Sequence, residues 1–208
     1  SMKDVETELP EKLVISTILK REDVRDSFIS RKYSSIAELP LGSVVGTSSL
    51  RRKAQLLNKR NDLKVVEFRG NIQKRLEKLD KNVAVATFLA TAGLNRLGLE
   101  ELINPISTDE MLPAVAQGAV GIEHLHGEKI EEILAPLNDS VSKKRVVAER
   151  AFLQELDGSC RTPIGGLAQK NNEEFIFMGE IISADGQEKI YDVWQGDWAM
   201  AEEIGREA

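Results

Sequence analysis

Short apolar runs alternate with amphipathic stretches through the first half of the chain. Runs rich in β-branched residues predict strands at residues 13–19, 43–47, 64–68 and 82–86. Apolar residues that share one helical face predict helices at residues 48–57 and 72–79, and a third helix carrying Leu89, Ala92, Gly93 and Leu97. Strands alternating with helices are typical of a parallel or mostly parallel sheet with helices on its faces. The first half is therefore predicted to be an α/β unit.

The pattern changes in the second half. A glycine-punctuated strand is predicted at residues 116–123, and a long helix at residues 139–156. Two apolar runs, at 175–178 and 190–194, flank an Asp-Gly turn at 185–186, which favours a β-hairpin. Residues 201–208 have the pattern of a helix. The last part is therefore predicted to be a small antiparallel sheet with helices.

Composition and charge narrow the class of protein. The 208 residues are 41% hydrophobic and 30% charged, as in a globular protein with a core, and the net charge is −6. This charge gives the chain no electrostatic reason to bind nucleic acid or an acidic membrane. No apolar run approaches the roughly 20 residues that span a bilayer. No signal peptide precedes the first charged residues, and there is one cysteine. We therefore expect a cytoplasmic protein.

Arginines follow the predicted strands. Arg51 and Arg52 lie in the first turn of a helix, where the helix dipole makes cations mildly unfavourable. The exposed N–H groups of that turn, the hydroxyls of residues 47–49 and two guanidinium groups together would bind an anion. Arg69 and Arg75 repeat the arrangement at the next strand-to-helix junction. Ligands of open α/β sheets bind at the carboxyl ends of strands, so we predict an anion site there.

The ligand is predicted to be a polycarboxylate. The chain has neither a Walker-type lysine loop nor a Gly-x-Gly-x-x-Gly motif, which argues against a nucleotide. Two alternatives stay open for the arginines. Arg51 and Arg52 could be solvated surface residues, and Arg96, near the end of the third helix, could interact with the helix dipole instead.

Cys160 is the single cysteine, in the polar, turn-rich loop 156–165. A lone thiol forms no intramolecular disulfide and does not by itself make a zinc site. Many free cysteines are small buried hydrophobes, which is the alternative to a functional role. Buried cysteines usually lie in apolar runs, whereas this one is flanked by glycine, serine and Arg161, which favours the thiolate. We therefore consider it a candidate attachment point.

Two histidines are weaker candidates. His124 and His126 lie two residues apart on a predicted strand, with Glu123 and Glu128 nearby. That spacing could present both rings to a metal, but no further ligand cluster supports it, so no metal site is predicted. Taken alone, Lys3 and Asp4 are uninformative.

Eight segments, in the same order, resemble the porphobilinogen deaminase (hydroxymethylbilane synthase) family. They lie at residues 1–5, 21–26, 45–52, 69–71, 92–98, 112–118, 148–150 and 158–165. The most specific are Val-Gly-Thr-Ser-Ser-Leu-Arg-Arg at 45–52 and Gly-Ser-Cys-Arg-Thr-Pro-Ile-Gly at 158–165. The resemblance covers nearly the whole chain.

The resemblance implies a three-domain architecture. Domains 1 and 2 of the family are α/β domains like those of periplasmic binding proteins, and domain 3 is a small α+β domain with an antiparallel sheet. Residues 1–20 and 114–136 would be a remnant of domain 1, on the side of the catalytic aspartate. Residues 21–113 would be the arginine-rich domain 2, and residues 137–208 a C-terminally truncated domain 3 with the cofactor-anchoring cysteine.

The resemblance also implies a chemistry. In the family, the loop cysteine holds a dipyrromethane cofactor by a thioether bond, and the enzyme builds this primer from its own substrate. Four porphobilinogen units, each with an acetate and a propionate, are condensed onto it with loss of ammonia. Hydrolysis then releases the linear tetrapyrrole hydroxymethylbilane. Arginine suits the many carboxylates because it binds them bidentately and stays charged.

Motif matches assign residue roles by resemblance. Asp4 matches the catalytic carboxylate, which would stabilise cationic charge and assist proton removal. The cofactor would be bound by Cys160, Lys3, Ser49, Arg51, Arg52 and Gly118. The substrate and growing chain would be bound by Thr47, Ser48, Arg69, Arg75, Arg96 and Gln117. The partners implied are porphobilinogen and its pyrrole-chain intermediates, and the family is usually monomeric.

The chain departs from the family pattern in several places. It has Val24 for a frequent proline, Asn95 for a common basic residue, Val85 for an aspartate and Ala116 for a glycine. Most of domain 1, including a lysine-bearing lid, has no counterpart, so we expect a fragment that lacks turnover. Two other functions stay open. One is a non-catalytic module that binds polycarboxylates, and the other is a cysteine-nucleophile enzyme with His124 or His126 as base.

Overall fold

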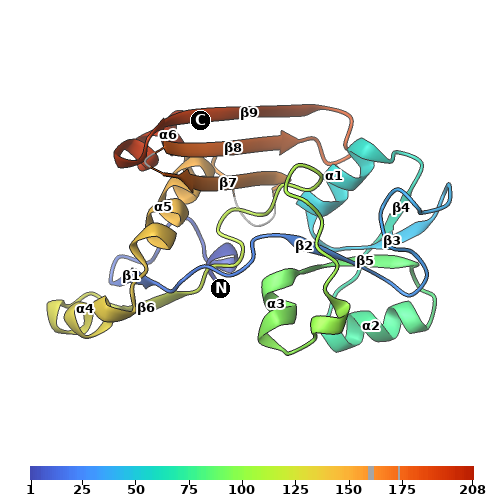
Figure 1. Ribbon diagram of the computed structural model, residues 1–208, viewed down its shortest axis with the longest axis horizontal. Helices are drawn as coiled ribbons and strands as arrows, with labels where there is room; N and C mark the ends of the chain where they lie inside the picture. The colour runs from blue at the N-terminus through green and yellow to red at the C-terminus, as the bar shows by residue number, and fades with distance from the viewer. Residues whose placement is uncertain (159–161, 173) are drawn as a thin grey trace.

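Three separate β-sheets organise the protein. The computed structural model describes residues 1–158, 162–172 and 174–208. Figure 1 shows the sheets in three regions, with helix α5 running between the sheet β7–β8–β9 and the strands β1 and β6. In chain order the elements are η1 (Met2–Asp4), β1 (Leu13–Ile18), β2 (Asp26–Ser30), β3 (Val44–Gly46), α1 (Leu50–Lys59), β4 (Lys64–Val66), α2 (Ile72–Asp80), β5 (Ala86–Ala90), α3 (Thr91–Arg96), η2 (Glu100–Leu102), β6 (Gly121–Leu125), α4 (Glu128–Leu134), η3 (Ala135–Leu137), α5 (Ser140–Glu155), β7 (Ile164–Asn171), β8 (Glu174–Ile182), β9 (Lys189–Asp197), η4 (Trp198–Met200) and α6 (Ala201–Glu207).

The four-stranded sheet confirms the predicted α/β unit. Its order is β2–β5–β3–β4, and β3 is parallel to both β4 and β5. Helices α1, α2 and α3 each follow one of these parallel strands. Strand β2, which runs antiparallel to β5, was not predicted. Because β2 is antiparallel, its first residue, Asp26, lies beside Ala90, at the edge where the parallel strand β5 ends.

The strand predicted at 82–86 begins later than expected. Asn82 adopts a positive φ of 54°, and the N–H of Val83 donates to Lys78, so these residues end α2. The strand is β5, at Ala86–Ala90, and Leu89 lies in it rather than in the following helix. Asparagine tolerates the left-handed conformation better than most residues, which explains why the helix ends there.

The two-stranded sheet joins segments that are far apart in the sequence. β1 confirms the strand predicted near residue 13, and it pairs antiparallel with β6. The strand predicted from residue 116 was wrong in its start, because residues 114–118 form turns. Gly118 has φ +83°, and a Cβ there would lie 2.7 Å from the carbonyl oxygen of Glu22. This close approach of two backbones requires glycine and delays the strand to Gly121.

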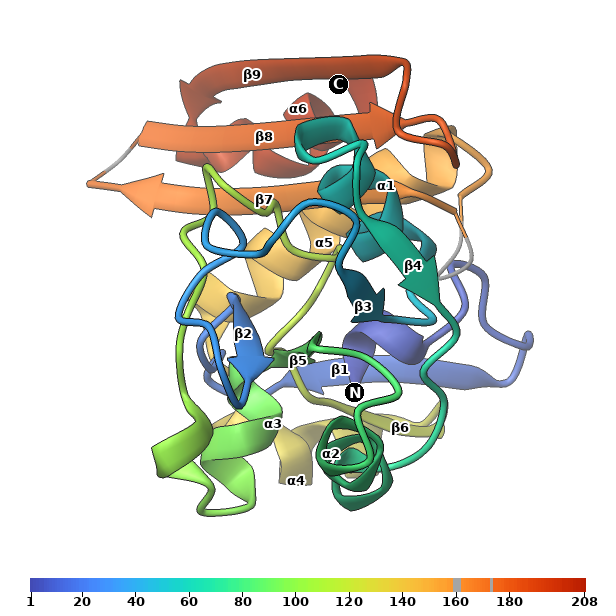
Figure 2. The same ribbon diagram turned by 90° about the vertical axis from the view of Figure 1, so that its right-hand side faces the viewer.

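The third sheet confirms the predicted antiparallel hairpin. β8 pairs with β9 and also with β7, which was not named from the sequence. Helix α5 covers one face, where Phe152 meets Phe177 with ring centroids 5.0 Å apart and Trp194 packs against both. Figure 2 shows this sheet lying above α1 and the four-stranded sheet. The predicted division of the chain into three domains stays a prediction.

One buried ion pair ties the regions together. The Arg21 guanidinium donates two hydrogen bonds to Glu149 of α5, at 2.6 and 2.9 Å, and both side chains are almost fully buried. The same carboxylate accepts from the backbone N–H groups of Ala116 and Ala168. A third donor of Arg21, Nε, bonds the carbonyl oxygen of Gln117. Segments from all three regions therefore meet at Glu149.

Replacing Glu149 by glutamine should destabilise the protein strongly. Removing one partner of a buried pair leaves an uncompensated charge, which typically costs about 3–5 kcal/mol. We expect a loss of that size in the free energy of unfolding, measured by urea denaturation with Trp194 fluorescence. As a control, Asp80→Asn breaks the exposed Arg31–Asp80 pair and should cost less than about 1 kcal/mol. Equal effects of the two substitutions would contradict this account.

Candidate functional site

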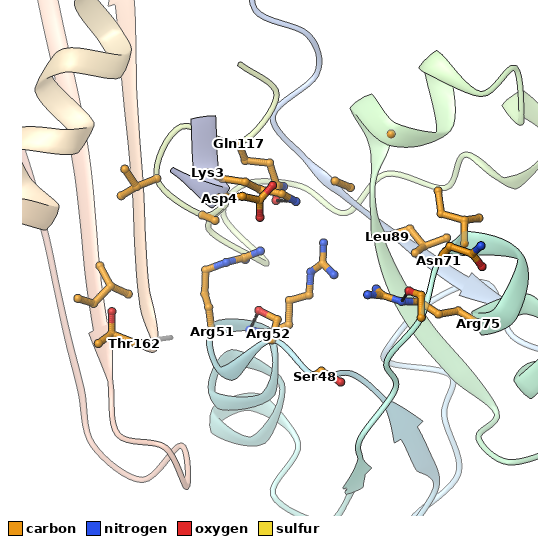
Figure 3. A pocket seen from close by; sticks show the side chains of 18 of the residues that line it. Lys3, Asp4, Ser48, Arg51, Arg52, Asn71, Arg75, Leu89, Gln117 and Thr162 are labelled. Carbon is orange, nitrogen blue, oxygen red and sulfur yellow. Dashed lines mark hydrogen bonds between the residues drawn. The ribbon is translucent and has the colours of Figure 1, made fainter. Parts of the chain in front are cut away.

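A cavity of about 450 Å³ lies where β3, β4 and β5 end and the helices α1, α2 and α3 begin. This is the edge at which open α/β sheets bind ligands, as the sequence predicted, and the volume suits a small molecule. We call it the arginine cavity. It is lined by Lys3, Asp4, Ser48, Ser49, Arg51, Arg52, Gly70, Asn71, Ile72, Arg75, Leu89, Ala90, Gly93, Ala114, Val115, Gln117, Leu153, Thr162 and Ile164. Figure 3 shows Lys3, Asp4 and Gln117 on one side and Ser48 on the other, with Arg51 and Arg52 between them.

Lys3 and Asp4 are held over the cavity by the residue before them. Met2 is buried, and its N–H donates to the carbonyl oxygen of Ala119 at 3.0 Å. Gly121 leaves room for the Met2 sulfur, which a Cβ at that position would overlap. The short η1 turn therefore presents the next two side chains to the cavity. The ammonium of Lys3 donates to Gln117 Oε1 at 3.5 Å.

The start of α1 supplies two arginines. Ser49 is the N-cap residue, and its hydroxyl accepts from the N–H of Arg52. Arg51 and Arg52 are 4% and 6% exposed, so they are not the solvated pair that was the alternative interpretation. Arg51 Nη1 donates to the carbonyl oxygen of Leu112 and Arg52 Nη1 to that of Phe88.

A buried carboxylate that sequence reasoning missed lies between these arginines. Asp26 is fully buried and accepts from Arg51 at 2.8 Å and from Arg52 at 2.7 Å. Burial by itself would raise the pKa of Asp26, but the charges and hydrogen bonds of the two arginines outweigh it and hold the pKa well below its usual range. The available signal was that two arginines in the first turn of a helix, where the dipole disfavours cations, need a carboxylate partner, and the 21–26 motif ends in an aspartate.

The start of α2 forms another wall. Asn71 is the N-cap residue, with its side chain accepting from the N–H of Lys74, so a helix N-terminus also faces the cavity. Arg75 is half-buried, and its Nε donates to the carbonyl oxygen of Gly70 at 2.9 Å. Burial and the neighbouring Arg52 charge lower the pKa of Arg75. Figure 3 shows Arg75 beside Arg52, on the side of α2.

The return segment contributes Gln117. Its side chain is fully buried, and Nε2 donates to Asp26 Oδ1 at 2.9 Å and to the carbonyl oxygen of Val24 at 2.7 Å. Gln117 therefore links Lys3 to Asp26. Gly118 does not line the arginine cavity, because its place is against the backbone of Glu22.

Three of the predicted substrate contacts lie outside this cavity. Thr47 and Arg69 line a neighbouring cavity of about 650 Å³ on the other side of the α1 start, where Ser48 and Ser49 also lie. The Arg69 side chain is 81% exposed and pairs with Glu67. Arg96 is exposed in the last turn of α3, where a cation interacts favourably with the helix dipole. This position fits the alternative interpretation of Arg96. Their predicted contacts with carboxylates stay predictions.

The predicted anchor, Cys160, lies outside the described residues. Thr162, two positions later in the chain, lines the arginine cavity, and so does Ile164 at the start of β7. The chain therefore enters the cavity wall directly after the segment that contains this cysteine.

The donors of the cavity suit an anionic ligand. Its described lining carries four cationic side chains but only one carboxylate, Asp4, and the buried Asp26 adds a second behind the wall. The Nε–H groups of Arg51 and Arg52 are buried and have no hydrogen-bond partner among the described residues. Buried donors without partners are rare and costly, so these arginines fit carboxylate oxygens supplied by a ligand. A dipyrromethane, with two carboxylates on each ring, is a ligand of the anionic kind that these donors suit.

The histidines lie elsewhere. His124 bonds Ser16 and His126 pairs with Glu131, and neither lines the arginine cavity. The side chain of Glu128, considered with them, lies outside the described part of the structure. Within the described residues, no group of three or more His, Cys, Asp or Glu could hold a metal ion. No helix in that same part of the chain is long and apolar enough to cross a membrane.

The fold and the cavity define an α/β protein with a cavity lined by cationic side chains at the carboxyl ends of parallel strands. Its family follows from known proteins. Residues 1–132 match the model described as porphobilinogen deaminase, dipyromethane cofactor binding domain, and residues 143–208 match the model of the porphobilinogen deaminase C-terminal domain. The chain belongs to the porphobilinogen deaminase family.

Individual relatives agree with this family. The chain is 55% identical to porphobilinogen deaminase of Paracoccus denitrificans over 91% of this chain and 61% of that protein. It is 48% identical to that of Nitrobacter hamburgensis and 47% identical to the chloroplastic protein of Pisum sativum, in each case over 100% of this chain. The chain spans between 58% and 66% of the length of these relatives. A solved lipoprotein from Enterococcus faecalis is similar over 71% of this chain and 69% of its own, with 15% identity and a TM-score of 0.40, a likeness too distant to support an argument.

Lys3 should titrate far below an ordinary lysine. Burial and the charges of Arg52 and Arg51 lower its pKa from 10.5 to about 8, while Asp26 and Asp4 oppose the shift. Between these values the unfolded chain binds more protons than the folded protein, so the stability should rise with pH across pH 8–10.5. The measurement is the free energy of unfolding against pH for the wild type and Lys3→Met. Parallel profiles for the two proteins would contradict the lowered pKa.

Proposed function

We propose that this chain is the part of a porphobilinogen deaminase that holds the dipyrromethane cofactor in the arginine cavity, linked to the sulfur of Cys160. The observation that carries the proposal is the pair of arginines on the cavity wall, whose guanidinium groups keep N–H donors without a partner among the described residues. A carboxylate entering the cavity would satisfy these donors. The family match names a ligand with such carboxylates.

The cofactor carboxylates would be bound by Lys3, Ser49, Arg51 and Arg52. Lys3 and the arginines supply charge, and the start of α1 supplies its dipole and free N–H groups. Gly118 would act indirectly, because its close packing against Glu22 fixes the turn that carries Gln117. These groups are held by the fold before any ligand arrives, which lowers the entropic cost of binding.

The substrate and the growing chain would contact a second set of residues. Arg75, Ser48 and Gln117 lie on the cavity wall, and Gln117 accepts a hydrogen bond from Lys3. Thr47, Arg69 and Arg96 would contact carboxylates that extend beyond the cavity, with Thr47 and Arg69 in the neighbouring one. A product that lengthens ring by ring needs such outlying cations, because its charge grows with each addition.

Asp4 would be the catalytic carboxylate. It lies on the cavity wall beside Lys3 and opposite Ser48 (Figure 3). A carboxylate there can accept hydrogen bonds from pyrrole N–H groups and stabilise positive charge that develops on a reacting ring. It can also take up a proton after coupling.

The reaction proposed for the whole protein is the condensation of four porphobilinogen units into hydroxymethylbilane with loss of ammonia, in tetrapyrrole biosynthesis. When bound, the cofactor supplies the pyrrole carbon to which the next ring is joined. The residues of this chain bind and orient the carboxylates, and Asp4 holds the proton. Metal chemistry has no part in the proposal.

We further propose that the protein works in the cytoplasm as a monomer, apart from nucleic acids and membranes. The net charge of −6 disfavours binding to polyanions, and a single cysteine fits a reducing compartment.

The mass of the intact protein tests the cofactor. After incubation with porphobilinogen, we expect an adduct of two porphobilinogen units less two ammonia molecules, because each attachment releases one. The Cys160→Ser variant should keep the unmodified mass. Wild-type protein that never gains mass, or an adduct that persists in Cys160→Ser, would contradict the attachment and leave a non-covalent polycarboxylate-binding module.

Arg75→Gln tests carboxylate recognition without touching the core. Loss of a charge-assisted hydrogen bond should weaken porphobilinogen binding by about 10- to 100-fold, measured by isothermal titration calorimetry. Arg31→Gln is the matched control, because Arg31 is an exposed arginine that lines neither cavity and pairs with Asp80. Equal affinities of the two variants would speak against arginine-based recognition in this cavity.

A further inference from the structure

Asp26 is not among the predicted site residues, yet it lies directly behind the arginine cavity. It is a fully buried carboxylate at the first residue of β2, and each of its oxygens accepts from a different arginine of α1. Oδ1 accepts additionally from Gln117 Nε2 at 2.9 Å. Its backbone is fixed as well, because β2 pairs with β5 and the carbonyl oxygen of Asp26 accepts from the N–H of Ile106.

The two arginines are held at both ends of their guanidinium forks. In each, Nη2 donates to Asp26 and Nη1 donates to a backbone carbonyl, that of Leu112 for Arg51 and that of Phe88 for Arg52. Two fixed bonds on one planar group prevent rotation about the Cζ–Nε bond. Each guanidinium keeps three further N–H donors, one on each Nη and one on Nε, and the Nε–H has no partner among the described residues.

The carboxylate also overcomes a repulsion. Arg51 and Arg52 are adjacent, both buried, and both in the first turn of a helix, where the dipole disfavours cations. Without a buried anion, the side chains would gain hydration by turning outward. Figure 3 instead shows both guanidinium groups directed from the start of α1 toward Lys3, Asp4 and Gln117.

We propose that Asp26 is a positioning residue, which locks Arg51 and Arg52 in one orientation and leaves their remaining N–H donors for ligand carboxylates. The inference rests on the function proposed above. Through Gln117, which bonds both Asp26 and the ammonium of Lys3, the same carboxylate aligns a third cation of the cavity. Asp26 itself touches no ligand.

The substitution Asp26→Asn separates positioning from simple charge. Asparagine keeps the shape but removes a negative charge next to an anion site, so electrostatics alone predicts tighter binding of porphobilinogen. Positioning predicts the opposite, and we expect binding about 10- to 100-fold weaker in isothermal titration calorimetry. Asp62→Asn is the matched control, because Asp62 holds Arg60 through two hydrogen bonds away from the cavity, and its affinity should stay within about twofold of the wild type.

The variant Asp26→Glu tests whether the place of the carboxylate matters, or only its negative charge. It keeps the negative charge and displaces the carboxylate by one methylene, so binding should again weaken. Wild-type affinity in either Asp26→Asn or Asp26→Glu would overturn the inference while the proposed function stands.

A spectroscopic readout on the wild-type chain needs neither a variant nor a ligand. Nitrogen-15 spectra should show separate Nη–H signals for Arg51 and Arg52, because their guanidinium groups do not rotate freely. Averaged Nη–H signals for both would overturn the inference even where a variant fails to fold. Added porphobilinogen should shift the two Nε–H signals. A wild-type chain that does not bind porphobilinogen would refute the proposed function, and the Nη–H signals would still decide the role of Asp26.

Discussion

The burial of two arginines against one carboxylate is the interaction on which the rest of the site depends. It fixes the start of α1 to the first residue of β2 and, through Gln117, to the segment that returns to β6. Three parts of the chain that are distant in sequence therefore share one network of hydrogen bonds. Because an unpaired buried charge is so costly, these parts are held together whenever the arginines stay inside.

In the described part of the chain, Asp26 and Glu149 each lie at the centre of a buried ionic cluster, and the two clusters differ in their ratio of cations to anions. Arg21 and Glu149 form a balanced pair in which all four hydrogen bonds of the carboxylate go to Arg21 and backbone N–H groups. It lines no part of the arginine cavity, and its role is structural. The cluster around Asp26 has two cations for one anion, and the Nε–H groups of both arginines have no partner within the described residues. Of these two clusters, the one around Asp26 combines an excess of positive charge with a place beside the cavity, and we therefore assign it the binding role.

Much of this arrangement could be predicted from the sequence. Helical periodicity located α1 and α2, the serines before Arg51 indicated the helix start, and the Asp-Gly turn gave the C-terminal hairpin. The placement of Arg51, Arg52 and Arg75 near the ends of parallel strands followed from the alternation of strands and helices. These features depend on neighbours in the chain, which a sequence pattern records.

The features that were missed depend on contacts between distant residues. Strand β2 is short, and nothing local reveals that Asp26 at its start is the partner of two arginines 25 and 26 positions later. The same holds for Gly118, where the backbone of Glu22 excludes a side chain in addition to the positive φ of the turn. Arg69 and Arg96 are exposed whereas Arg75 is half-buried, although all three follow strands in the sequence.

The lining of the cavity has a limited excess of positive charge, while a dipyrromethane brings two carboxylates on each of two rings. The proposed ligand therefore requires more than the arginines, and the helix N-termini at Ser49 and Asn71 supply the remaining donors without adding a charge that would need its own buried partner.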